Sequence, residues 1–233
     1  LPIMLDDMYT NKLTTWVEPF VGGANVIQHV PSKFTRIGSD YFEHTIAALI
    51  GVRDHLDSLP ADVSEEYYKL LKGTPADPIT SWIRFVCSFA GIFSNSYART
   101  KGGTSRTYAG EGLRGAIVQS PLIQGVDLLV GDYTIHSDKV GCVIYCDPPY
   151  RSTTGYKGTG RFDYDAFYDW CRKMSKNNIV YVSEYDMPDD FECVWTGNIA
   201  TNFSSQRESS IVSVAKEKLY RISDLNAEYT FPF

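Results

Sequence analysis

The stretch Val143-Ile144-Tyr145-Cys146-Asp147-Pro148-Pro149-Tyr150 joins an apolar run to an acidic residue and two consecutive prolines. The apolar run, which begins near Val140, predicts a buried strand that ends at Cys146. The two prolines fix φ and remove two N–H donors, so the chain turns a stiff corner that cannot continue a strand ladder. The stretch therefore predicts a strand followed by a rigid turn that presents a carboxylate, a carbonyl and an aromatic ring.

Other short apolar runs and helical patterns alternate on both sides of this stretch. Strands are predicted at 16–17, 36–38, 126–130 and 179–183, and helices at 44–56 and 164–176. This alternation predicts an α/β fold with a mainly parallel sheet. The end of the chain, 211–215 followed by 218–222, is expected to form an antiparallel pair.

One region interrupts the alternation. Helical patterning at 64–71 and 79–93 gives way to a loop rich in glycine, serine, threonine and arginine from Asn95 to Gly115. Long polar loops inside compact domains are usually functional or disordered. We interpret residues 60–124 as a small, mainly helical insert in a sheet domain made of 1–59 and 125–233.

The composition is that of a globular protein. The chain has 233 residues, of which 43% are hydrophobic and 21% charged, which excludes a disordered or collagen-like chain. Its apolar runs are too short to span a membrane, and no signal peptide is expected. Five cysteines without a Cys-x-x-Cys pair favour a reducing cytoplasm and no metal site. Because the chain begins at Leu1, we expect an upstream segment to be missing.

The corner at Asp147 has a specific chemical use. A carboxylate and the Pro148 carbonyl form two adjacent acceptors, which suit an exocyclic amino group with two hydrogens to donate. The Tyr150 ring beside them suits stacking on a planar base. The alternative is an ordinary Pro-Pro turn with an aspartate cap.

A second candidate site is Glu18-Pro19-Phe20-Val21-Gly22-Gly23, which comes directly after the strand at 16–17. Paired glycines allow positive φ and a close approach of ligand to backbone, and a helix is expected to start near Asn25. Asp40 ends the next strand, where nucleotide-binding α/β units place an acid on ribose hydroxyls. The alternatives are a plain strand-to-helix turn and a helix N-cap.

A third acid at a strand end is Asp132, in Gly131-Asp132-Tyr133. It comes after the strand predicted at 126–130, so it would lie at the same edge of the sheet as Asp40 and Asp147. An ordinary turn acid explains the residue equally well.

Together these motifs resemble the Dam-like (class D12) DNA adenine-N6 methyltransferases, particularly the phage and prophage forms. Glu18 to Gly23 is similar to their AdoMet-binding motif I, and Asp147 to Tyr150 to their catalytic motif IV. The segments Cys87 to Arg99, Ser183-Glu184-Tyr185 and Glu217 to Tyr220 are also similar to that group. The family's Gly-Ser-Lys-type motif X is expected upstream of Leu1.

The resemblance implies a Rossmann-like AdoMet-dependent methyltransferase sheet and a role for each matched residue. S-adenosyl-L-methionine would be the methyl donor, with no metal. The catalytic residues would be Asp147, Pro148 and Tyr150. The cofactor-binding residues would be Glu18, Pro19, Phe20, Gly22, Gly23, Asp40, Asp132 and Asp147.

Net charge is −6, but two loops are locally basic. Residues 95–119 and 151–162 each carry a net charge of +3 and are rich in residues that let the backbone approach phosphates. They predict contacts with double-stranded DNA, although solvated surface loops are the simpler alternative. The predicted DNA-binding residues are Arg99, Lys101, Arg106, Arg151, Lys157 and Arg161.

The sequence thus predicts a cytoplasmic enzyme of a bacterial or phage-infected cell that methylates N6 of adenine in DNA. The insert at 60–124 would be its target-recognition region. A monomer is favoured. Two alternatives stay open: a methylase relic that binds DNA without turnover, and an amino-group methyltransferase that acts on RNA or protein.

Overall fold

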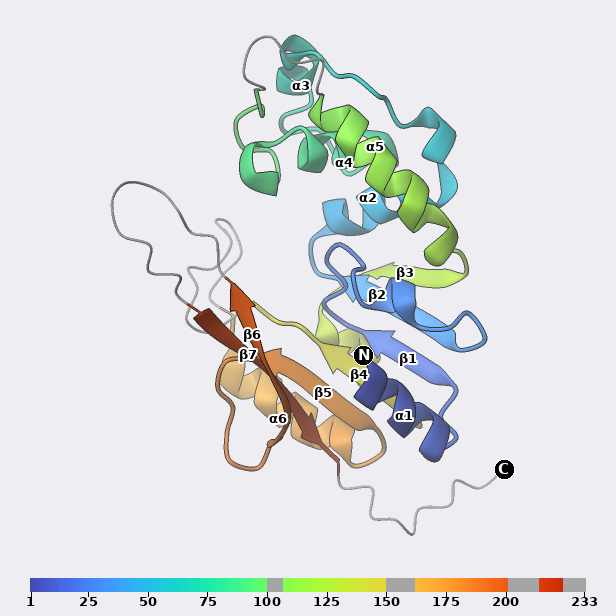
Figure 1. Ribbon diagram of the computed structural model, residues 1–233, viewed down its shortest axis with the longest axis vertical. Helices are drawn as coiled ribbons and strands as arrows, with labels where there is room; N and C mark the ends of the chain where they lie inside the picture. The colour runs from blue at the N-terminus through green and yellow to red at the C-terminus, as the bar shows by residue number, and fades with distance from the viewer. Residues whose placement is uncertain (100–106, 150–161, 201–213, 224–233) are drawn as a thin grey trace. The chain divides into compact units, whose positions relative to one another are not determined.

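The computed structural model describes residues 1–99, 107–149, 162–200 and 214–223 (Figure 1). The chain forms two compact units. The first contains Leu1–Pro19 and Thr134–Phe233, and the second contains Phe20–Tyr133. Tyr150 and five of the six predicted DNA-binding residues, Lys101, Arg106, Arg151, Lys157 and Arg161, lie outside the described residues.

The first unit is built on five strands in the order β1-β4-β5-β7-β6. Strands β1 (Thr15–Glu18), β4 (Cys142–Cys146) and β5 (Ile179–Glu184) are parallel. Strand β7 (Val214–Ile222) runs antiparallel to β5 and pairs with β6 (Glu192–Ala200) at the edge. The parallel strands therefore end at one edge, where α/β sheets bind ligands.

Helices cover both faces of this part of the sheet. Figure 1 shows α1 (Pro2–Thr10) on one face and α6 (Tyr164–Ser175) on the other. Every residue of β4 and β5 is buried as a result. Strands buried on both faces are continuous apolar runs, which is why their positions could be predicted from the sequence.

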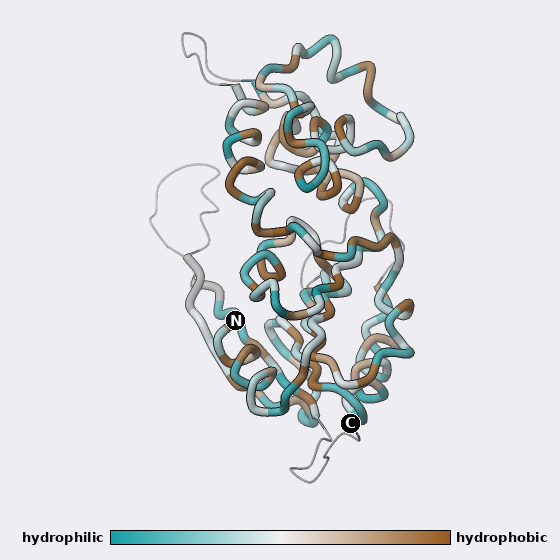
Figure 2. Tube along the Cα trace, turned by 90° about the vertical axis from the view of Figure 1, so that its right-hand side faces the viewer, coloured by the Kyte–Doolittle hydropathy of each residue, from teal (hydrophilic) through white to brown (hydrophobic). Residues whose placement is uncertain are grey.

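The second unit pairs β2 (Thr35–Asp40) in parallel with β3 (Val126–Val130). Helices α2 (Glu43–Asp54), α3 (Glu65–Leu70), α4 (Pro78–Val86) and α5 (Tyr108–Gln119) lie between them in sequence. Side chains cap three of these helices: Ser64, Asp77 and Thr107. In Figure 2 the helical region at the top contains both hydrophilic and hydrophobic residues.

The α/β prediction is confirmed, with a Rossmann-like arrangement of parallel strands and helices. The strands predicted at 16–17, 36–38, 126–130 and 179–183 are all present. The helical region between β2 and β3 is present too, and it lies within the second unit, whose bounds are Phe20–Tyr133. The 60–124 limits of a target-recognition insert remain a prediction. Within the described ranges, no helix combines the length and apolarity needed to cross a membrane.

The loop predicted from Asn95 to Gly115 is wrong in its second half, where α5 begins at Tyr108. The helix was not predicted because its sequence contains three glycines, and glycine usually disfavours helices. Gly112 is needed for packing: a Cβ there would lie 2.8 Å from Val86 Cγ1 and 3.2 Å from Trp82 Cζ2. The close approach of α5 to α4 therefore explains the glycine.

Two further predictions are corrected. No α-helix starts near Asn25, where the chain makes turns and a single 3-10 turn, η1 (Ile27–His29). The expected terminal pair of 211–215 with 218–222 is also wrong, since Val214–Ile222 is one continuous strand that pairs with β6. Strand β6 escaped prediction because a bulge between Cys193 and Trp195 breaks its alternation.

Candidate functional site

The end of β4 forms the corner that the two prolines predict. Asp147 is exposed, Pro148 is buried and Pro149 is half-buried. The Tyr164 hydroxyl, from the first turn of α6, donates a hydrogen bond of 2.6 Å to the Pro149 carbonyl. The corner thus offers an exposed carboxylate on a chain segment that continues from β4 and is hydrogen-bonded to α6.

Acidic residues also end the two strands that flank β4. Glu18 ends β1 and is 2% exposed, and its Oε2 accepts a hydrogen bond of 3.2 Å from Trp16 Nε1. Glu184 ends β5, is also 2% exposed, and its Oε2 accepts the Tyr185 N–H at 2.8 Å. The parallel registers place both acids at the same edge as Asp147. Three acidic side chains therefore lie at this edge of the first unit, which we call the acidic edge.

Cys146, the last residue of β4, is fully buried beside this edge. Complete burial raises the pKa of Cys146 well above its usual value, and the neighbouring Cys171, Asp147 and Glu18 raise it further. Cys146 is therefore a neutral thiol in the core. A packing role in the core agrees with this environment.

In the second unit, Asp40 organises the glycine turn. Its Oδ2 accepts the Gly22 N–H at 3.2 Å, and its Oδ1 accepts the Phe42 N–H at 2.8 Å. Burial raises the pKa of Asp40, and these two N–H groups partly offset the rise. Asp40 is therefore both the strand-end acid and the residue that fixes the turn. It is not the N-cap of α2, which is Phe42, so the N-cap alternative is wrong.

Two aromatic rings flank the strand ends of the second unit. Phe20 and Tyr133 stack with their ring centroids 6.0 Å apart and their planes at 29°. Tyr133 comes directly after the exposed Asp132 at the end of β3, and the Gly131 N–H donates to the Asp40 carbonyl at 3.0 Å. An acid, a glycine turn and a pair of rings thus lie at one edge of the β2–β3 pair.

These residues fit the ribose portion of AdoMet. Each Asp40 oxygen accepts one backbone hydrogen bond and has a second lone pair, so the carboxylate offers two acceptors to a vicinal diol. Gly22 adopts a φ of +47°, and a Cβ at this position would meet no atom within 4 Å. A ligand therefore has open space beside the backbone at this turn.

The predicted site residues divide between the two units. Glu18, Pro19, Asp147 and Pro148 belong to the first, and Phe20, Gly22, Gly23, Asp40 and Asp132 to the second. Arg99 is exposed and forms an ion pair with Glu65. Hydrogen bonds from Arg99 and, to a smaller extent, from Lys69 lower the pKa of Glu65 to about 2. Arg99 and Lys69 therefore share the single carboxylate of Glu65.

Two residues at the acidic edge have no role that the sequence predicts. Glu184 stands in the segment Ser183-Glu184-Tyr185, and its burial at a strand end is a finding of the structure. Tyr164 is predicted only as part of a helix. A polar residue directly after an apolar strand is the signal for Glu184, whereas no local pattern marks the bond from Tyr164 to Pro149.

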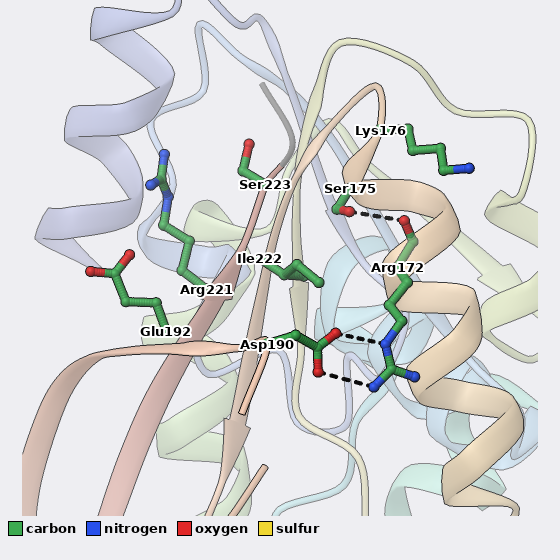
Figure 3. A pocket seen from close by; sticks show the side chains of 8 residues that line it. All are labelled: Arg172, Ser175, Lys176, Asp190, Glu192, Arg221, Ile222 and Ser223. Carbon is green, nitrogen blue, oxygen red and sulfur yellow. Dashed lines mark hydrogen bonds and ion pairs between the residues drawn. The ribbon is translucent and has the colours of Figure 1, made fainter. Parts of the chain in front are cut away.

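A surface cavity of about 420 Å³ lies elsewhere on the first unit (Figure 3). Its wall contains a bidentate ion pair, in which Arg172 Nε and Nη2 donate to Asp190 Oδ2 and Oδ1 at 2.7 and 3.0 Å. The register of Val180 with Ile222 places this cavity at the amino end of β5, opposite the Asp147 edge. It is therefore separate from the candidate site. No cluster of possible metal ligands occurs among the described residues.

Comparison with known proteins gives only distant structural similarity. No family model and no curated protein matches the chain. The rRNA methyltransferase aviRa from Streptomyces viridochromogenes is 10% identical, with 94% of this chain and 81% of that chain covered and a TM-score of 0.42. The putative methyltransferase yhhF from Escherichia coli is 7% identical, with 95% and 83% covered and a TM-score of 0.39.

A third solved structure, SMU.472, a putative methyltransferase complexed with SAH, is 12% identical over 90% of this chain and 48% of that chain, with a TM-score of 0.28. All three proteins are named as methyltransferases. Similarity at these values carries no argument about the chemistry of this chain, which must be argued from its own residues.

Proposed function

We propose that this protein is an AdoMet-dependent methyltransferase that acts on N6 of adenine in double-stranded DNA. The observation that carries the proposal is the corner at the end of β4, where an exposed Asp147 precedes a buried Pro148. The resemblance of the same residues to a catalytic motif, and the glycine turn fixed by Asp40, support it.

The corner suits the acceptor half of the reaction. The amino nitrogen of adenine is a poor nucleophile because its lone pair is delocalised into the ring. Asp147 and the Pro148 carbonyl would accept both N6 hydrogens, localise that lone pair and direct it towards the methyl group. Positioning and electrostatics of this kind supply most of the acceleration in such sites. Because a paired base cannot reach the corner, the adenine must leave the helix.

The second unit suits the donor half. Asp40 would hold the ribose diol, Gly22 and Gly23 would let the cofactor approach the backbone, and Phe20 would contact the adenine ring of AdoMet. When bound, AdoMet supplies an electrophilic methyl group on a sulfonium.

Asp147→Ala tests the proposal. We expect the variant to lose at least ~100-fold in transfer of tritiated methyl groups to unmethylated DNA, because it lacks one of the two acceptors. It should still bind AdoMet in calorimetry, since the Asp40 turn is untouched. Asp6→Ala, which removes an exposed carboxylate of α1, is the matched control and should keep full activity. Undiminished turnover in Asp147→Ala would remove this residue from the mechanism.

A further inference from the structure

The two prolines of the Asp147 corner limit how its backbone can be anchored. Pro148 and Pro149 have no N–H, so neither residue donates to a neighbouring strand. Strand β4 ends its pairing with β5 at Cys146. Rigid φ angles fix the local shape of the corner, but something else must fix its direction relative to the sheet.

Tyr164 provides such an anchor. Its hydroxyl donates to the Pro149 carbonyl at 2.6 Å, a bond between residues 15 positions apart in the chain. A carbonyl at the end of two residues without N–H groups is one of the few polar atoms through which the corner can be held. The bond therefore joins the last proline directly to helix α6.

The tyrosine itself is held on a rigid element. It is the first residue of α6, whose N-cap Asp163 accepts the Ala166 N–H at 3.0 Å. Its ring packs edge-on to Phe162, with the centroids 4.9 Å apart. One turn further on, Phe167 is fully buried against the sheet. The hydroxyl is thus positioned by a capped and anchored helix end.

We propose that Tyr164 is a positioning residue, which sets the direction of the Asp147 carboxylate through its hydrogen bond to Pro149. This inference rests on the proposed function. Helix α6 is buried through Phe167, Trp170, Cys171 and Met174, so one hydroxyl contributes little to its folding. Misplacement of a catalytic group by 1 Å, in contrast, can cost on the order of 100-fold in rate.

Tyr164→Phe removes only the hydroxyl, and Tyr181→Phe is its matched control. The Tyr181 hydroxyl makes a bond of the same length, 2.6 Å, to Asp7 of α1. We expect Tyr164→Phe to lower kcat by about 10- to 100-fold. Its KM for AdoMet should stay within twofold of the wild-type value. Tyr181→Phe should keep the wild-type kcat, and each variant should lower Tm by about 2–4 °C.

Hydrogen exchange provides a second readout that needs no turnover. We expect Tyr164→Phe to speed exchange of the Asp147 amide several-fold while the amides of β5 stay protected, and Tyr181→Phe to leave the Asp147 amide unchanged. Unaltered exchange at Asp147 in Tyr164→Phe would overturn the positioning role, and so would an equal loss of kcat in both variants. An inactive wild-type protein would count against the proposed function instead, and exchange would still decide the role of Tyr164.

Discussion

Asp40 builds the glycine turn and, under the proposed function, would also hold the ribose of AdoMet. Its two oxygens accept the Gly22 and Phe42 N–H groups, which stabilises the carboxylate, while burial works against the charge and raises the pKa. The ionised form is the one that offers lone pairs to a ribose. Affinity for AdoMet should therefore fall on acidification at a higher pH than for an ordinary aspartate.

Asp40→Ala should weaken AdoMet binding by about tenfold or more, which corresponds to ~1.4 kcal/mol. The physical reason is the loss of two acceptors for the diol, together with a turn whose Gly22 N–H has lost its partner. Isothermal titration calorimetry measures the affinity, and circular dichroism checks the fold. Asp127→Ala, on the neighbouring strand β3 but away from its carboxyl end, should bind AdoMet normally. Equal affinities in the two variants would exclude the ribose role.

His136 makes folding depend on pH. Its side chain is fully buried in the 3-10 turn η5 (Tyr133–His136), and burial lowers its pKa to about 4. In the unfolded chain the imidazole takes up a proton near pH 6.5, whereas in the folded protein it does so only near pH 4. The contribution of His136 to the free energy of unfolding is therefore complete above pH 6.5 and is lost as the pH falls towards 4.

Urea unfolding at pH 7 and pH 5 should show most of this contribution, about 2 kcal/mol between the two pH values. We expect His136→Gln to be less stable than wild type at pH 7 but to lose less stability between the two values. A parallel decline in both proteins would assign the acid sensitivity to other groups.

At the scale of elements, two glycines of α5 differ in the space around them, since one is tightly packed and the other is not. A Cβ at Gly112 would lie 2.8 Å from Val86 Cγ1, whereas one at Gly115 would meet nothing within 4 Å. Sequence patterns treat the two residues alike, which is why they predict a loop where α5 forms. Only the spacing between α4 and α5 distinguishes them.

Alanine substitution at each position tests this difference. Gly112→Ala should destabilise the protein by about 1–3 kcal/mol, because overpacking exceeds the gain in helix propensity. Gly115→Ala should stabilise it by ~0.5–1 kcal/mol, since an exposed helical glycine is simply replaced by a better helix former. Thermal or urea unfolding measures both, and equal effects would contradict the tight α4–α5 packing.

Elements were predictable where local chemistry decides them. The buried strands β4 and β5 are apolar runs, and Ser64 marks the start of α3 as a cap. Edge strand β6 was not predictable, because its bulge breaks the alternation that reveals a strand. The expected helix near Asn25 shows the same limit, since a glycine turn after a strand does not by itself determine the next element.

At the scale of the whole molecule, the acids of the candidate site were predictable because each comes after an apolar strand. Asp40, Asp132 and Asp147 all lie at strand ends, as their positions in the sequence predict. The bond from Tyr164 to Pro149 was not, since it depends on how helix α6 is placed against β4. Long-range contacts of this kind leave no period in the sequence.

Charge is also distributed unevenly over the molecule, with a net −6 overall and two loops of +3. If six basic side chains contact phosphates as predicted, affinity for duplex DNA should fall about 10³-fold between 50 and 200 mM salt. Fluorescence anisotropy with a labelled duplex measures this slope. An affinity that does not change with salt would rule out the two basic loops as the DNA-binding surface.

The most direct test of the proposed function is the chemical identity of the methylated product. The protein is incubated with tritiated AdoMet and unmethylated duplex DNA, and the DNA is digested to nucleosides and separated. The proposal predicts label in N6-methyldeoxyadenosine, which Asp147→Ala lowers by at least ~100-fold. Label in a cytosine nucleoside, or label only when RNA or protein replaces the DNA, would contradict it.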